Sequence, residues 1–136
     1  KIVAIKEACG NIEQMQAILD GRPKDFLVLS GDDGITVELV KRGGDGVISV
    51  AANAFPERFC GCVHNAMKGN IALAESEIAE LTPAIDLLFK EGNPTGVKAM
   101  TAAMGITRPE VRLPLVEGTE NLAADIKSAI ARYELK

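Results

Sequence analysis

Lys6 lies where a lysine could act as a nucleophile. Residues 2–6 read as a short apolar strand that stops at Lys6, and a helical segment follows. An ammonium group at the end of a buried strand is costly unless it is paired, hydrated or used. A lysine driven toward neutrality by desolvation attacks carbonyl carbons, so this placement suggests Schiff-base chemistry. The common alternative is a strand end whose stem packs while its charge stays in water.

The elements around Lys6 predict a parallel sheet. Three strand-like runs recur at regular spacing, and each ends in small or polar residues: 2–6, 26–30 and 46–50. Two helices are predicted between them, one capped by Asn11 and the other over residues 33–42. Both faces of the first strand are apolar, as in a parallel strand covered on both sides. The alternation of strand and helix therefore predicts an α/β fold.

After residue 50 the chain reads as helical. Pro56 is expected to begin a helix that reaches about Met67, and Thr119 is expected to cap the last helix. A shorter helix is predicted near residues 97–104, and residues 112–115 are predicted to be extended. One long helix carries a continuous apolar stripe and should kink at Pro83: Ile71, Ala74, Ile78, Leu81, Ile85 and Leu88.

The predicted elements divide near Asn53. Residues 1–53 form a βα part, and residues 54–136 form a helical part. Three parallel strands cannot close a barrel, and they leave an apolar edge unpaired in water. A (β/α)₈ barrel needs roughly 250 residues. The simplest interpretation is that this chain is the C-terminal portion of a larger protein.

Composition narrows the function classes. The net charge is −4 and no basic cluster occurs, which argues against a nucleic-acid partner. No apolar run reaches transmembrane length, so no membrane role is predicted. The three cysteines are an odd number and are not spaced as a disulfide framework, which favours a reducing cytosol.

Segments in a fixed order make the chain resemble a known family. The stretch Ile5-Lys6-Glu7-Ala8-Cys9-Gly10-Asn11 resembles the Schiff-base lysine motif of the dihydrodipicolinate synthase / N-acetylneuraminate lyase family. The Gly31-Asp32-Asp33 turn resembles the dihydrodipicolinate synthase branch in particular. The further matching segments follow in the order of the family: 29–33, 46–53, 93–98 and 112–115. Together these segments span nearly the whole chain.

This resemblance implies a fold and an activity. It implies the C-terminal part of a (β/α)₈ TIM barrel, with its last three βα units in residues 1–53. Residues 54–136 would hold the barrel-closing helix and a C-terminal helical domain. The implied activity is that of a lyase in lysine (diaminopimelate) biosynthesis, which condenses pyruvate with L-aspartate semialdehyde to 4-hydroxy-tetrahydrodipicolinate. A cytoplasmic homotetramer without a cofactor is implied as well.

The resemblance also assigns roles to site residues. Lys6 would form the covalent imine with pyruvate, Ile48 would contact pyruvate through its main chain, and Gly31 would lie where aspartate semialdehyde enters. The family's tyrosine, threonine and arginine partners belong to upstream strands, so this chain alone is expected to be nearly inactive. Gly96 stands where the family often has proline, and we expect it to loosen that loop. Cys9 stands where the family usually has Ser or Thr.

Alternatives remain open at this point. The chain could belong to another pyruvate-dependent class I aldolase of the family, such as a sugar-acid or neuraminate lyase, or it could be a non-catalytic folding or association fragment. The Cys60, Cys62 and His64 side chains could suggest a metal site. On a helix, however, Cys62 would point away from the other two, so no metal site is predicted. The Asp32-Asp33 pair is expected to cap a helix rather than to bind a cation.

Overall fold

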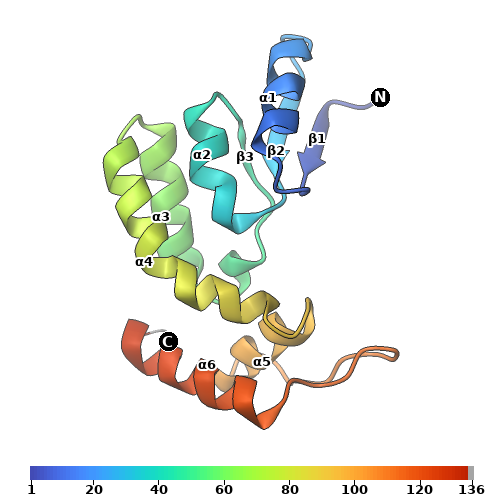
Figure 1. The fold of residues 1–136 in the computed structure, drawn as a ribbon, viewed down its shortest axis with the longest axis vertical. Helices are drawn as coiled ribbons and strands as arrows, with labels where there is room; N and C mark the ends of the chain where they lie inside the picture. The colour runs from blue at the N-terminus through green and yellow to red at the C-terminus, as the bar shows by residue number, and fades with distance from the viewer. Residues whose placement is uncertain (135–136) are drawn as a thin grey trace. The chain divides into compact units, whose positions relative to one another are not determined.

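A three-stranded parallel sheet forms the first part of the fold (Figure 1). The computed structural model describes residues 1–134. Its strands are β1 (Ala4–Glu7), β2 (Leu27–Ser30) and β3 (Gly46–Val47), in the spatial order β1-β2-β3. In the register, Lys6 pairs with Leu29, and Leu29 pairs with Gly46. The predicted parallel α/β arrangement is therefore confirmed.

The third strand is shorter than predicted. The Ile48 amide still donates to the Ser30 carbonyl at 2.9 Å, but Val50 has helical dihedral angles (φ −86, ψ −43). A residue in that conformation cannot continue a pleated strand. The chain instead enters a 3₁₀ turn, η2 (Ala51–Asn53), so the prediction of a strand to residue 50 is wrong.

Two helices follow β1 and β2, and their side-chain caps explain where they begin. Helix α1 (Ile12–Gly21) starts after Asn11, whose side-chain oxygen accepts the Gln14 amide at 3.0 Å. After β2, Asp32 accepts the Gly34 amide at 2.9 Å and begins η1 (Asp33–Ile35), which leads into α2 (Thr36–Lys41). Such caps satisfy amides that have no partner within the helix. The capping role predicted for the Asp32-Asp33 pair is thus observed for Asp32.

Helices α1 and α2 pack on one face of the sheet. Met15 of α1, Leu39 of α2 and Val28 of β2 are fully buried together, with Ile5 packed against them. The opposite face carries every second strand residue, and we call it the lysine face: Ala4, Lys6, Leu27, Leu29 and Gly46. This face is more open, since 45% of Leu27 is exposed.

An ion pair between Arg22 and Asp45 lies at the amino ends of β2 and β3, away from the strand end that carries Lys6. The Asp45 carboxylate accepts the amide of Val28 at 2.8 Å and pairs with the Arg22 guanidinium. Arg22 also donates to the carbonyls of Phe26 (3.2 Å) and Gly43 (3.0 Å). One half-buried pair therefore fixes the loops that lead into β2 and β3.

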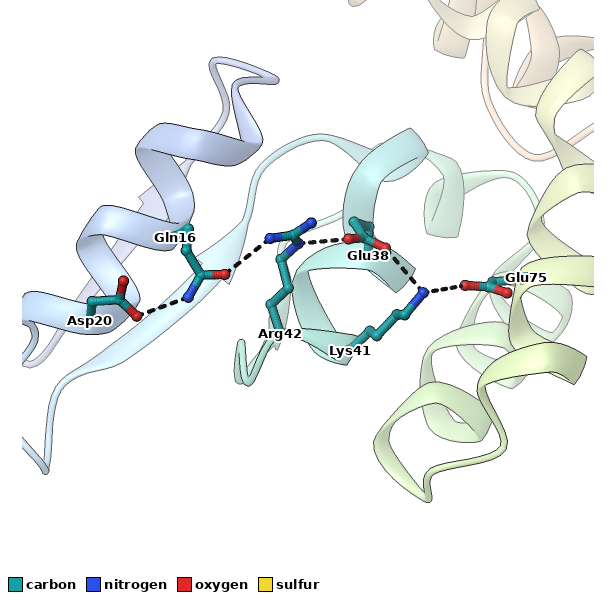
Figure 2. Close-up of polar contacts among 6 residues, drawn as sticks. All are labelled: Gln16, Asp20, Glu38, Lys41, Arg42 and Glu75. Atoms are coloured by element: carbon teal, nitrogen blue, oxygen red, sulfur yellow. Dashed lines mark hydrogen bonds and ion pairs between the residues drawn. The ribbon is translucent and has the colours of Figure 1, made fainter.

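A chain of polar contacts links the outer surfaces of three helices (Figure 2). It begins on α1, where Gln16 bonds Asp20, and crosses to α2 through a 3.2 Å bond from Arg42 to Gln16. It ends on α4 (Ile71–Phe89), where Glu75 pairs with Lys41 at 2.9 Å and raises the pKa of that lysine. These groups are exposed or half-buried at the surface, so each pair contributes little stability.

The chain forms two compact units. The first comprises residues 1–49 and 57–80, and the second comprises residues 50–56 and the chain from Leu81. The remaining helices are α3 (Pro56–Met67), α5 (Thr95–Ala103) and α6 (Glu120–Tyr133). No helix in residues 1–134 is long and apolar enough to cross a membrane.

The long helix α4 confirms the predicted apolar stripe. Pro83 lies inside the helix without ending it. Five positions of the stripe are buried: Ala74, Ile78, Leu81, Ile85 and Leu88. In the first unit, Arg58 pairs with Glu80 at 2.8 Å, and Asn65 donates to Glu77 at 2.9 Å, which joins α3 to α4.

In the second unit, α5 packs tightly against the end of α4. A Cβ atom on Gly96 would lie 2.2 Å from the Leu88 carbonyl oxygen, so only glycine fits there. Gly96 is buried in the first turn of α5, and the expectation that it loosens a loop is wrong. The prediction of extended structure over residues 112–115 is also wrong, because the Leu115 amide donates to the Arg112 carbonyl at 3.0 Å and closes a turn.

Helix α6 begins as predicted at Thr119. The Thr119 hydroxyl accepts the Leu122 amide at 3.3 Å, and it also donates to the Glu91 carboxylate at 2.5 Å. Glu91 accepts the Thr119 amide as well, at 2.8 Å, and these bonds from the Thr119 side chain and amide lower the pKa of Glu91. Lys90 pairs with Asp125 at 2.7 Å. Lys90 and Glu91, which directly follow α4, therefore hold the first turns of α6 in place.

Candidate active site

Lys6 lies at the carboxyl end of β1, on the lysine face. It is the third of the four residues of β1, and its side chain is exposed. Within residues 1–134, no carboxylate lies within ion-pair distance of its amine. Residues at the carboxyl ends of parallel strands are where barrel and doubly wound folds place their chemistry. The amine is thus accessible at the expected edge of the sheet.

Gly31 lies directly against the Lys6 side chain. It follows the last residue of β2, and its amide donates to the Glu7 carbonyl at 2.6 Å. A Cβ atom built on Gly31 would lie 2.7 Å from Lys6 Cε and 3.1 Å from Lys6 Cγ. Real Cβ atoms essentially never come within 3.0 Å of another atom, so the stem of Lys6 occupies the space that a side chain at residue 31 would need.

Ile48 follows β3 at the same edge. Its amide is used in the 2.9 Å bond to Ser30, the residue just before Gly31. The main-chain group that Ile48 can offer to a ligand is therefore its carbonyl oxygen. Its side chain is 50% exposed. Lys6, Gly31 and Ile48 thus lie at the carboxyl ends of three neighbouring strands, and Lys6 and Gly31 are in contact.

Sequence reasoning missed Ala8 as a neighbour of this site. The Ala8 Cβ would lie 2.6 Å from a Cβ on Gly31, closer than either Lys6 atom. The sequence carries little signal for this, because Ala8 lies just beyond the last residue of β1, where strand alternation no longer fixes the face of a side chain. The Ala8 methyl and the Lys6 stem thus lie beside the same point over the Gly31 backbone.

The turn after β1 is ordered by Glu7. Its carboxylate accepts the Cys9 amide at 2.8 Å and the Gln14 side-chain amide at 2.9 Å. Hydrogen bonding to the Cys9 side chain and amide, and then to Gln14, holds the pKa of Glu7 below its usual value. A carboxylate that receives several hydrogen bonds is favoured in its charged form. Glu7 therefore fixes the path of the backbone that leaves Lys6.

The turn after β2 is ordered in a similar way. The buried Ser30 hydroxyl donates to the Asp32 carbonyl at 2.7 Å and accepts the Asp32 amide at 3.1 Å. Thr36 also donates to the Asp32 carbonyl, at 2.8 Å. These bonds hold the backbone on both sides of Gly31, so Gly31 cannot easily move away from Lys6.

The cysteines do not build a metal centre in the part of the chain that the structure describes. No group of three or more His, Cys, Asp or Glu side chains lies close enough to hold an ion in residues 1–134. Cys60 is exposed, whereas Cys62 is buried and donates to the Arg58 carbonyl at 3.2 Å. Burial, helped by the nearby charge of Glu77, raises the pKa of the Cys62 thiol to about 11.

Comparison with known proteins supports the resemblance drawn from the motifs. The model of the dihydrodipicolinate synthetase family matches residues 1–133. A 4-hydroxy-tetrahydrodipicolinate synthase of Phocaeicola vulgatus is 50% identical over 115 residues, which cover 85% of this chain and 39% of the relative.

Two solved dihydrodipicolinate synthase structures have the same fold as this chain over the matched residues. The dihydrodipicolinate synthase of Aquifex aeolicus matches with a TM-score of 0.94 at 33% identity, over 98% of this chain and 46% of that chain. The chloride-inhibited dihydrodipicolinate synthase of Acinetobacter baumannii was solved in complex with pyruvate. It matches with a TM-score of 0.93 at 30% identity, over 99% of this chain and 46% of that chain.

The chain thus spans less than half the length of these relatives. It matches their C-terminal part, which comprises the end of a TIM barrel and a helical domain. This confirms the predicted fold. Because the family model covers nearly all of the sequence, this chain belongs to the dihydrodipicolinate synthetase family.

Proposed function

We propose that this chain supplies the imine-forming lysine, Lys6, of a lyase that condenses pyruvate with L-aspartate semialdehyde to 4-hydroxy-tetrahydrodipicolinate, in lysine biosynthesis. The observation that carries the proposal is the placement of the Lys6 stem over Gly31, with its amine accessible at the carboxyl edge of the sheet. The pyruvate complex of the Acinetobacter baumannii relative supports the first substrate.

The reaction follows from the chemistry of a lysine imine. The neutral Lys6 nitrogen attacks the ketone carbon of pyruvate, the former ketone oxygen takes up protons from a general acid and leaves as water, and a protonated, cationic imine remains. This cation draws electrons from the adjacent methyl group, which loses a proton to give an enamine. The enamine carbon then attacks the aldehyde carbon of the second substrate, and the product cyclises as it leaves Lys6. No cofactor is needed in this scheme, because the imine is the electron sink.

Two further residues have proposed roles. Ile48 contacts bound pyruvate through its main chain: its amide is already bonded to Ser30, so its carbonyl oxygen is the group that can accept the N–H of the pyruvate imine. Gly31 is assigned to the entrance for L-aspartate semialdehyde by the family resemblance, and the absence of a side chain there lets the Lys6 stem lie against its backbone. Each proton transfer needs a positioned acid or base. We propose that the tyrosine, threonine and arginine partners come from upstream strands, so that this chain alone is nearly inactive.

The same proposal covers the organisation of the complete protein. Residues 1–53 are assigned to the last three βα units of the barrel, and residues 54–136 to the barrel-closing helix and the C-terminal domain. A homotetramer in the cytoplasm rests on the family resemblance, and an odd number of cysteines without the spacing of a disulfide framework fits a reducing compartment. Light scattering during size-exclusion chromatography measures the oligomeric state.

The test is a trapping experiment on a full-length chimera. In it, this chain replaces the matching C-terminal part of the Phocaeicola vulgatus relative, and the unmodified relative is the positive control. The chimera is incubated with pyruvate and reduced with borohydride, and the adduct is located by mass spectrometry. We expect a pyruvyl adduct at Lys6 and none in a Lys6→Arg chimera, which keeps the charge and cannot form an imine.

Two results would contradict the proposal. One is an adduct of equal yield in the Lys6→Arg chimera, and the other is no adduct at Lys6 under conditions that label the relative. A screen of second aldehydes with the same chimera separates L-aspartate semialdehyde from the sugar-derived aldehydes that a sugar-acid or neuraminate lyase would use. The isolated chain, assayed beside the chimera, tests whether it is inactive alone.

A further inference from the structure

Ala8 shares a small space with the Lys6 stem. A methyl group on Gly31 would lie 2.6 Å from the Ala8 Cβ and 2.7 Å from Lys6 Cε. Both carbons therefore border the same point above the Gly31 backbone, one from each side chain. The Ala8 methyl and the Lys6 stem therefore both lie beside the backbone of Gly31.

The backbone holds Ala8 firmly in this position. The residue before it, Glu7, receives the Gly31 amide on its carbonyl at 2.6 Å. The residue after it, Cys9, donates its amide to the Glu7 carboxylate at 2.8 Å. The backbone on both sides of Ala8 is thus held by hydrogen bonds, so its methyl group stays beside Gly31.

We propose that Ala8 is a positioning residue for Lys6, whose methyl group confines the lysine stem to one path across Gly31 and so sets where the amine meets the carbonyl carbon. This inference rests on the proposed function, because it assigns no chemistry to Ala8 itself. A side chain with three rotatable bonds beyond Cβ reaches a reacting carbon in a fixed geometry only if its neighbours restrict its rotamers.

Opposite changes in size at residue 8 should both harm the reaction. In Ala8→Val, two added methyl groups compete with the lysine stem for the space over Gly31, and the amine is displaced. In Ala8→Gly, the stem gains freedom and the amine spends less time in the reactive position. Misplacement of a reacting group by about 1 Å can lower a rate on the order of a hundredfold.

The experiment measures imine formation in the full-length chimera. The rate of borohydride trapping at Lys6 is followed at increasing pyruvate concentration for the wild type, Ala8→Val and Ala8→Gly. We expect the rate at saturating pyruvate to fall roughly ten- to a hundredfold in Ala8→Val and about threefold or more in Ala8→Gly. The half-saturating pyruvate concentration should change less than about threefold, because Ala8 acts on the amine rather than on the groups that bind the free acid.

A matched control separates positioning from general damage. Ala17 is an exposed alanine of α1 in the same unit, and Ala17→Val adds the same methyl groups away from Lys6. Equal trapping rates in Ala8→Val and Ala17→Val would overturn the inference. So would a change in the half-saturating pyruvate concentration without a change in the rate at saturating pyruvate. If Ala8→Val does not fold, Ala8→Gly decides: a saturating rate equal to that of the wild type overturns the inference. Loss of trapping in the wild-type chimera instead refutes the proposed function.

Discussion

Replacing Gly96 by alanine is expected to destabilise the second unit by about 2 kcal/mol. The added Cβ would lie 2.2 Å from the Leu88 carbonyl oxygen and 2.7 Å from the Leu87 carbonyl oxygen. Both obstacles are backbone atoms of α4, so no rotamer change can make room. The start of α5 must move by about 1 Å to restore an ordinary contact distance, which is the kind of overpacking that costs about 1–3 kcal/mol.

Two terms set the size of the expected loss. We take the upper end of the overpacking range, about 3 kcal/mol, because the obstacle is rigid backbone. Alanine is the better helix former by about 1 kcal/mol, which offsets part of that cost and leaves about 2 kcal/mol. Gly61 in α3 is the matched control, because a Cβ there meets no atom within 4 Å apart from the backbone of its own helix and its chain neighbours. Gly61→Ala should therefore stabilise by about 0.5–1 kcal/mol.

The assay is urea unfolding of the three chains, followed by far-ultraviolet circular dichroism. The midpoint should fall for Gly96→Ala and rise for Gly61→Ala relative to the wild type. The reasoning is refuted if Gly96→Ala unfolds within about 0.5 kcal/mol of the wild type, a range that surface substitutions already cover. It is also refuted if both variants shift the midpoint in the same direction.

Three further outcomes are expected. Asp45→Ala should lose about 2 kcal/mol in urea unfolding, because the buried Val28 amide loses its acceptor, whereas Asp45→Asn keeps an acceptor and should lose less; equal losses would contradict this. The pKa of Glu7 is lowered in the folded chain, so its hydrogen bonds to the turn after β1 should be fully kept above pH 4.5 and be lost only as the pH falls through that lowered pKa. The chemical shift of its carboxyl carbon measures the titration, and a midpoint at or above pH 4.5 would be the contrary result. Iodoacetamide at pH 8 should label exposed Cys60 and spare Cys62, whose pKa is raised to about 11, and mass spectrometry of native and unfolded chain compares the two sites.

Local chemistry made much of this fold predictable. Asn11 and Thr119 are capping residues by type, and both accept the amide that their position predicts. The stripe from Ile71 to Leu88 has helical spacing, and most of it is buried. The end of β3 was not predictable in this way, because Val50 belongs to a β-prone run and yet takes helical dihedrals.

The site was predictable only in part. The sequence places Lys6, Gly31 and Ile48 near three strand ends, and parallel pairing brings those ends to one edge. The contact of Lys6 with Gly31 depends on strand register, which is set by pairing between residues far apart in the chain. Gly96 shows the same limit, because a glycine that packs against a helix and a glycine that loosens a loop look alike in a sequence.

The open side of the sheet has a practical consequence for handling this chain by itself. Leu27 is 45% exposed, and Ile2 and Val3, which lead into the edge strand β1, are 83% and 56% exposed. Apolar surface of this kind, beside an unpaired strand edge, invites self-association in water. We expect light scattering to grow with protein concentration and a hydrophobic dye to bind strongly. Purification should therefore begin with dilute samples.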